Sequence, residues 1–184
     1  TVIRMTDSAY EVVREGVIEA RYLDKLVRRT VLFVCTGNTC RSPMAAAIAR
    51  DLLADASGDD PLTEVVSAGL SAGPGSPMTP SAANALRAIG VEPGEHRSRS
   101  LSDRDLNRAD HVFAMTAGHL AGLAGGAGGR AELLDPEGGD VPDPFGGSQD
   151  EYDACCRRIR ELVTSRLQSL GMITQGDAAA GDMQ

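Results

Sequence analysis

The sequence predicts an α/β fold built on a parallel sheet. Four short segments with apolar residues have the character of strands, and segments with helical patterning lie between them. Such alternation is typical of strands that run parallel and are joined by helices. With 184 residues, 42% of them apolar, the chain can form one domain with a short appendage. Because only 3% are aromatic, we expect a core of Ala, Val, Leu and Ile.

The first strand is predicted at 31–34, where four apolar residues follow one another. The helix after it begins near Pro43, because a first helical turn tolerates a missing N–H, and runs to about Ala54. Glycines, prolines and polar residues separate the elements that follow. These are predicted at 63–68 (strand), 80–89 (helix), 110–115 (strand, then a short helix), 131–134 (strand) and 150–170 (helix).

The most informative stretch lies between the first strand and the first helix. A cysteine and an arginine are separated there by five residues, with a glycine and an asparagine in the turn. The stretch reads Cys35-Thr36-Gly37-Asn38-Thr39-Cys40-Arg41-Ser42. Active sites of parallel sheets lie at the carboxyl ends of strands, where this loop falls. The order of strand, turn and helix N-terminus predicts a phosphate site formed by residues 36–42, with a nucleophile at its floor.

Cys35 is the predicted nucleophile of this site. The helix N-terminus, the turn amides and the guanidinium of Arg41 all favour its thiolate form. Arg41 can hold two phosphate oxygens at once and stays charged. Ser42 can donate its hydroxyl to the thiolate, while Gly37 and Asn38 suit the backbone angles of a closed anion-binding turn.

Other kinds of site fit this stretch poorly. A nucleotide-binding loop needs G-x-x-x-x-G-K-S/T and a dinucleotide site needs G-x-G-x-x-G, and neither follows the first strand. The spacing of Cys35, Cys40, Cys155 and Cys156 does not match the usual paired modules of zinc sites. We therefore expect neither a metal nor a cofactor. A catalytically silent phosphate-binding module stays an alternative, although it has no need of a nucleophile.

A thiolate that attacks phosphorus needs an acid to protonate the leaving group, and later a base to activate water. Asp143 is the preferred candidate, because it lies next to Pro144 in a glycine-rich loop after the last strand. Asp135 and Asp140 lie in the same region and stay open as alternatives from the residues alone.

Residues 35–42, the Pro43-Met44-Ala45 that follows and Asp143-Pro144 resemble the low-molecular-weight protein-tyrosine-phosphatase family. The resemblance covers about residues 30–170. It implies a four-stranded parallel sheet flanked by helices on both faces. It also implies that Cys35, Arg41 and Asp143 are catalytic.

Two further positions match this family. Ser67, in Ser67-Ala68-Gly69, and His96, in His96-Arg97-Ser98, resemble residues that support the loop asparagine, here Asn38.

The loop and the acid region also bear on the substrate. The loop and residues 143–148 resemble the protein arginine phosphatase branch, because tyrosine-specific members usually carry a bulky aliphatic residue where this chain has Thr39. A small hydroxyl can orient water or contact a guanidinium, and Asp140 beside Asp143 favours a cationic group. Phe145 is the single aromatic residue near the acid, and Ser71 offers no pocket wall. Phosphotyrosine stays the alternative.

The cysteines leave two further questions open. Related arsenate reductases need resolving cysteines on a flexible segment, whereas Cys155 and Cys156 lie in the predicted last helix. We therefore consider that activity less favoured. Cys40 can trap an oxidised Cys35 as a reversible disulfide, or it can be a small apolar residue behind the loop.

The chain divides into three predicted parts: an extension at 1–29, a phosphatase domain at 30–171 and a disordered tail at 172–184. The chain does not begin with Met, and residues 1–16 are similar to the end of a YrdC-like threonylcarbamoyl-adenylate synthase domain. We expect either the remnant of a fused upstream domain or an ordinary extension with a linker helix at 23–29.

Composition limits the partners. A formal net charge of −8 argues against a broad nucleic-acid surface, and no run of about 18 apolar residues predicts a membrane span. Four cysteines without a signal pattern favour a reducing cytoplasm. The expected partners are phosphorylated protein substrates.

Overall fold

The computed structural model describes residues 1–5, 10–19, 22–23, 28–57, 62–127 and 129–174. Its central sheet has four parallel strands, as predicted, which are β3 (Arg29–Cys35), β4 (Thr63–Gly69), β5 (His111–Ala114) and β6 (Ala131–Leu133). Their spatial order is β4-β3-β5-β6, so β3 lies in the middle of the sheet with a partner on each side. Both partners buttress the strand that ends at Cys35.

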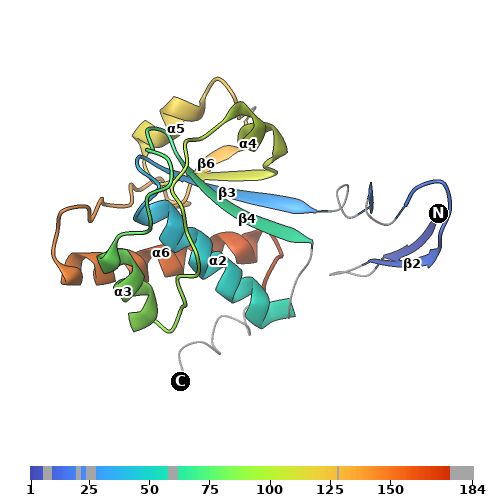
Figure 1. The fold of residues 1–184 in the computed structure, drawn as a ribbon, viewed down its shortest axis with the longest axis horizontal. Coiled ribbons are helices and arrows are strands. Elements are labelled where there is room, and N and C mark those ends of the chain that lie inside the picture. Colours follow the sequence, from blue (N-terminus) through green and yellow to red (C-terminus); the bar gives the residue numbers. More distant parts are fainter. Residues whose placement is uncertain (6–9, 20–21, 24–27, 58–61, 128, 175–184) are drawn as a thin grey trace.

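Helices cover both faces of this sheet (Figure 1). Three of them, α2 (Arg41–Ser57), α3 (Pro80–Ala88) and α6 (Gln149–Ser169), pack on one face. On the other face lie α4 (Asp103–Arg108) and α5 (Ala117–Leu123).

Alternate residues of β3 point to opposite faces of the sheet. Val31 and Phe33 join the core under α2, α3 and α6, whereas Leu32 and Val34 join the core under α4 and α5. All four side chains are fully buried. A strand covered on both faces requires a continuous apolar run. Burial of this run fixes the position of Cys35 at the end of the strand.

Two helices depart from the prediction. The helix after the loop begins at Arg41, two residues before Pro43, because the amide of Met44 already donates to Cys40 O at 3.1 Å. Proline is still accommodated, since the first helical amides have no partner inside the helix. The helix α4 was not predicted at all. It carries one buried apolar residue, Leu106, and its sequence signal is the capping box of Ser102 and Asp105.

The chain ends differ from the predicted division as well. Met172 and Ile173, assigned above to the start of a disordered tail, are buried in the core. The amide of Met172 donates to Leu167 O at 2.9 Å, which holds this segment against the end of α6. The rest of the predicted tail, 175–184, lies outside the described residues, as does most of the predicted linker helix at 23–29.

At the other end, β1 (Val2–Met5) and β2 (Tyr10–Arg14) pair antiparallel as a separate two-stranded sheet. The hairpin stands apart from the central sheet in Figure 1. Its resemblance to the end of a synthase domain stays a prediction.

The packing of α6 makes a stability prediction. Ile159 has no exposed surface between α6 and its neighbours, so Ile159→Ala removes buried methylenes and leaves a cavity. We expect the free energy of unfolding to fall by about 2–5 kcal/mol, measured by urea denaturation. Arg157→Ala, on the exposed face of the same helix, is the control and should change it by less than about 0.5 kcal/mol. A loss below about 1 kcal/mol at Ile159 would contradict this packing.

Candidate active site

The loop predicted as a phosphate site closes between the end of β3 and the start of α2. Cys35 is the last residue of β3, and Arg41 is the first residue of α2. Both side chains are buried, as are Asn38 and Ser42. The N-terminus of α2, with its unpaired amides and positive dipole end, therefore lies beside the sulfur.

Two donors approach the sulfur of Cys35. The amide of Asn38 donates to Sγ at 3.3 Å, and the Ser42 hydroxyl lies 3.0 Å from it. The Ser42 oxygen in turn accepts a hydrogen bond from the side-chain amide of Asn38 at 2.9 Å. That contact leaves its own proton to be donated, and a negative sulfur at 3.0 Å competes well with the Ala68 carbonyl at 3.4 Å. Both contacts thus direct hydrogen-bond donors at this sulfur.

Asn38 holds the loop in shape. Its φ is 54°, which makes it the one non-glycine residue with positive φ in the described part of the chain. Beyond the bond to Ser42, Nδ2 donates to Ser67 Oγ at 2.9 Å and Oδ1 accepts from the amide of Arg99 at 3.0 Å. Its carbonyl accepts a hydrogen bond from His96 Nε2 at 2.7 Å. The structure therefore brings Ser67 and His96 together on Asn38.

His96 acts here as a neutral donor. Burial lowers the pKa of His96, and the nearby guanidinium groups of Arg50 and Arg99 lower it further, while the hydrogen bond to Asn38 opposes them. At neutral pH the ring carries a single N–H, and the carbonyl of Asn38 fixes that proton on Nε2. The support for the loop consequently carries no charge of its own.

The main chain at the end of β4 packs directly against the loop. The amides of Leu70 and Ser71 donate to the carbonyls of Cys35 and Thr36 at 2.9 and 3.0 Å. A Cβ atom on Gly69 would lie 2.4 Å from Thr36 O, so only glycine allows this approach.

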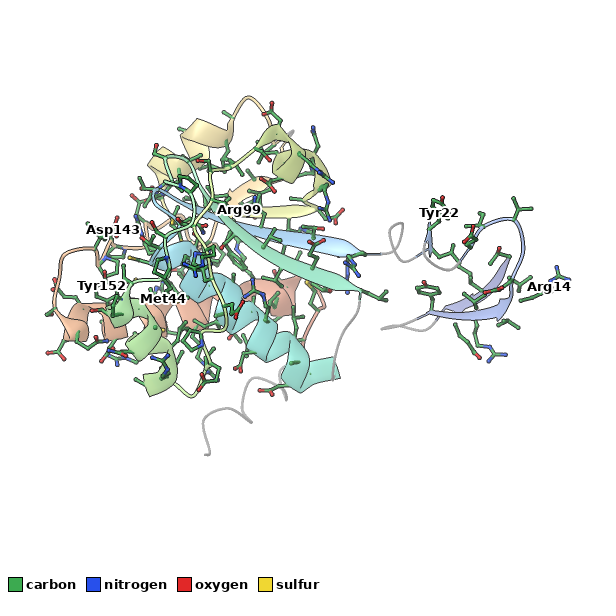
Figure 2. All side chains as sticks on the ribbon, in the orientation of Figure 1. Arg14, Tyr22, Met44, Arg99, Asp143 and Tyr152 are labelled. Atoms are coloured by element: carbon green, nitrogen blue, oxygen red, sulfur yellow. The ribbon has the colours of Figure 1, made fainter. Side chains whose placement is uncertain are left out.

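Asp143 reaches the site from the loop between β6 and α6. Its Oδ2 accepts a hydrogen bond from Arg41 Nη2 at 2.5 Å, and Arg41 Nη1 donates to Val141 O at 3.1 Å. The Arg41 side chain is 5% exposed, whereas that of Asp143 is 48% exposed. In Figure 2, Asp143 lies at the carboxyl end of the sheet, on the side opposite the N-terminal hairpin. A half-exposed carboxylate on a buried guanidinium can change partner when an anion arrives.

The two rival carboxylates are engaged elsewhere. Asp135 forms an ion pair with Arg158 at 2.8 Å and accepts a hydrogen bond from the amide of Glu137. Asp140 accepts a hydrogen bond from the amide of Ala117 at 2.7 Å, at the start of α5. Of the three, Asp143 is the one that contacts Arg41.

The remaining cysteines are packed side chains. The sulfur of Cys40 lies 3.4 Å from Thr79 Oγ1 and 3.5 Å from the hydroxyl of Tyr152. Burial raises the pKa of Tyr152. Burial also raises the pKa of Cys155 and Cys156 to about 12 each. Because thiol exchange needs a thiolate, this pair is poorly suited to resolve a disulfide. The regulatory disulfide of Cys40 with Cys35 stays a prediction.

His119 lies near the site and was not predicted from the sequence. His119 is buried at the start of α5, and its ring contacts Thr36 and Thr116. The only local signal is that Thr116 caps the helix three residues earlier.

The described residues form neither a metal site nor a membrane-spanning helix. Within them, no three His, Cys, Asp or Glu side chains come together in a way that could hold a metal ion. In the same part of the chain, no helix is both long and apolar enough to cross a membrane.

Comparisons with known proteins agree with this geometry. Residues 30–175 match the family model described as low molecular weight phosphotyrosine protein phosphatase. A protein-arginine-phosphatase of Geobacillus stearothermophilus is 36% identical over 147 residues, which cover 76% of this chain and 95% of the relative. A low molecular weight protein-tyrosine-phosphatase of Streptomyces coelicolor is 36% identical over 164 residues, covering 81% of this chain and 98% of the relative.

Solved structures give the same result. The YwlE arginine phosphatase from Geobacillus stearothermophilus superimposes with a TM-score of 0.70 at 36% identity, over 78% of this chain and 93% of that one. A cysteine-to-serine mutant of YwlE with a phosphorylated active-site serine gives 0.69 at 33% identity, over 77% and 95%.

The contacts of Asn38 predict that the loop fails without this side chain. Asn38→Ala removes three side-chain hydrogen bonds and places alanine at positive φ, so we expect the free energy of unfolding to fall by about 2–4 kcal/mol. Chemical denaturation measures this loss. Asn38→Gly keeps the backbone angle and should recover about 1 kcal/mol of it. Ser67→Ala, which removes one of the three bonds, should cost about 1 kcal/mol. Equal stability of the alanine variant and the unaltered protein would contradict the supporting role.

Proposed function

Because the chain belongs to the low molecular weight phosphotyrosine protein phosphatase family and is a phosphatase, we propose that it hydrolyses phosphoarginine in proteins through a phosphocysteine intermediate on Cys35. The catalytic residues are Cys35, Arg41 and Asp143. The amides of residues 36–42 bind the phosphoryl group, and no cofactor takes part.

In the first step the thiolate of Cys35 attacks phosphorus, an S–P bond forms and the P–N bond of phosphoarginine breaks. Arg41 binds two phosphoryl oxygens, so these replace the carboxylate that its guanidinium now holds at 2.5 Å. Asp143, released from that ion pair, is free to take up a proton and give it to the departing guanidine nitrogen. The contact of Ser42 with Sγ, at 3.0 Å, stabilises the sulfur whenever it is negative.

In the second step water attacks the phosphocysteine. Asp143 accepts a proton from this water, the S–P bond breaks, and inorganic phosphate leaves as the Cys35 thiolate returns. Arg41 is buried and keeps a hydrogen bond to Val141 O, so its charge stays fixed beside phosphorus through both steps. A YwlE mutant with a phosphorylated serine in its active site supports attachment of the phosphoryl group at the nucleophile's position.

The observation that carries the choice of phosphoarginine is Thr39. Its side chain is small, half-buried and hydroxylated, and it lies two residues before Arg41 in the loop. Around the site, Asp140 and Asp143 supply negative charge for a guanidinium, and the aromatic Phe145 is 71% exposed and so forms no closed wall. Protein-arginine-phosphatases among the relatives add support. Phosphotyrosine is the second candidate, since relatives of equal identity carry that name.

We also propose that the protein acts in the cytoplasm on phosphorylated proteins. All four cysteines are free thiols, and a cysteine nucleophile needs a reducing compartment to stay active.

The mechanism predicts separate losses for the nucleophile and the acid. Cys35→Ser should abolish turnover and still bind phosphate. Asp143→Asn should lower kcat by about 100-fold to 10,000-fold, because the leaving group loses its proton donor. Steady-state hydrolysis of phosphoarginine measures both. Asp135→Asn is the matched control, since this carboxylate pairs with Arg158, and it should leave kcat unchanged. Full activity of Cys35→Ser would refute the mechanism.

The substrate choice predicts a change of specificity at Thr39. The unaltered protein should hydrolyse phosphoarginine with a higher kcat/KM than phosphotyrosine. In Thr39→Ile the ratio of the two values should shift towards phosphotyrosine by about 10-fold to 100-fold, since a single pocket contact is worth about 1–3 kcal/mol. Thr39→Ser keeps the hydroxyl and is the control. A higher kcat/KM for phosphotyrosine in the unaltered protein would exclude the arginine assignment.

A further inference from the structure

A hydrogen-bonded chain of side chains ends at the residue that follows the nucleophile. The ring of His119 lies between two threonine hydroxyls, with Nδ1 2.7 Å from Thr116 Oγ1 and Nε2 2.8 Å from Thr36 Oγ1. His119 and Thr36 are 83 residues apart in sequence. The imidazole is buried, whereas Thr36 is exposed on the rim of the loop. One end of this series of hydrogen bonds is therefore fixed in the fold, and the other end is the exposed hydroxyl of Thr36 in the loop 35–42.

The hydrogen bonds of Thr116 set the direction in which protons are donated from Thr116 to His119 and on to Thr36. Thr116 caps α5, and its oxygen already accepts a hydrogen bond from the amide of His119 at 3.2 Å. This hydroxyl has one proton to donate, and within the described residues the imidazole Nδ1 is the remaining partner that can accept it. The arrangement that pairs this proton inside the protein therefore donates it to Nδ1. A neutral ring that accepts at Nδ1 carries its proton on Nε2 and donates it to Thr36. The proton of the Thr36 hydroxyl is then directed away from His119.

The charges around His119 agree with a neutral ring. Burial lowers the pKa of His119, and the positive charge of Arg41 lowers it further, while the carboxylates of Asp143 and Asp140 partly oppose this. These three charged groups belong to the site and to the loop beside it, which places the imidazole close to the phosphate-binding region. The ring is thus neutral at neutral pH and carries one proton for its two partners.

We propose that the Thr36 hydroxyl is a substrate contact that donates a hydrogen bond to a phosphoryl oxygen, and that His119 is the positioning residue that orients it. Thr36 directly follows Cys35, and its carbonyl is fixed by the amide of Ser71 at 3.0 Å. Both its main chain and its side chain are therefore held before substrate arrives. A donor fixed in advance costs no reorganisation when charge develops on the phosphoryl oxygens. This inference requires the phosphatase reaction but not the choice of phosphoarginine.

The first test replaces the hydroxyl. Thr36→Val has nearly the same shape, and it should lower kcat/KM about tenfold or more for both phosphoarginine and phosphotyrosine, because a hydrogen bond to a charged oxygen is lost. The inhibition constant of inorganic phosphate should rise by a similar factor. Thr36→Ser should stay within about threefold of the unaltered protein. Thr164→Val, on α6 and about 20 Å along that helix from its start, is the control for substitution of a threonine as such.

The second test asks whether His119 acts through Thr36. His119→Leu should lower kcat/KM about threefold to tenfold, and His119→Gln, whose amide can donate to Thr36, should recover most of this. In a double-mutant cycle, His119→Leu should have no further effect once Thr36 is Val, because its only route to the substrate is gone. Thermal unfolding of every variant identifies effects that come from loss of folding.

Three results would overturn the proposal. Thr36→Val can retain full activity on both substrates, which means that the hydroxyl contacts no phosphoryl oxygen. It can also lose activity on phosphoarginine alone, which would assign the hydroxyl to the guanidinium. Finally, the effect of His119→Leu can persist unchanged in the Thr36→Val background, which would make His119 a structural residue. If the unaltered protein prefers phosphotyrosine to phosphoarginine, the proposed substrate is wrong, but this inference on Thr36 and His119 is not affected.

Discussion

The left-handed turn at Asn38 is the constraint on which the site depends. An asparagine adopts this conformation more readily than most residues, and here its polar atoms meet five partners at once. The amide turns toward Cys35 only because the backbone bends at this residue. Without the bend, the helix N-terminus and the sulfur would not converge on one anion. Strain at one residue is offset by hydrogen bonds from three separate segments of the chain.

The sheet delivers those segments to one place. Parallel strands end at the same edge, so the main chain after β4 can lie against the loop after β3. Gly69 makes this approach possible, because any side chain there would meet Thr36 O. The alternating faces of β3 bury all its apolar residues and leave Cys35 at the rim. The sheet therefore determines where the segments of the site meet, and the loop supplies the amide that contacts Cys35.

How far the sequence predicts each part depends on whether its cause is local. The loop 35–42 is contiguous, so its spacing predicted the anion site and its nucleophile. The choice among Asp135, Asp140 and Asp143 is not local, because it depends on how one long loop folds between β6 and α6. The cap at Thr116 indicates where the helix of His119 begins, but it does not indicate the contact of His119 with Thr36, which is 83 residues away. The helix α4 is too short to show apolar periodicity.

The ion pair of Arg41 with Asp143 restricts which anions can bind to this guanidinium. Any anion that enters has to displace a carboxylate already held by the guanidinium. A singly charged ion such as chloride offers too little in exchange, whereas a phosphoryl dianion can outcompete the carboxylate with two oxygens. Binding of a phosphoryl group then frees the carboxylate of Asp143, which is the acid in the mechanism that we propose. Binding at this site is therefore an exchange of partners on Arg41, and the same exchange decides when the carboxylate of Asp143 is available for proton transfer in the proposed mechanism.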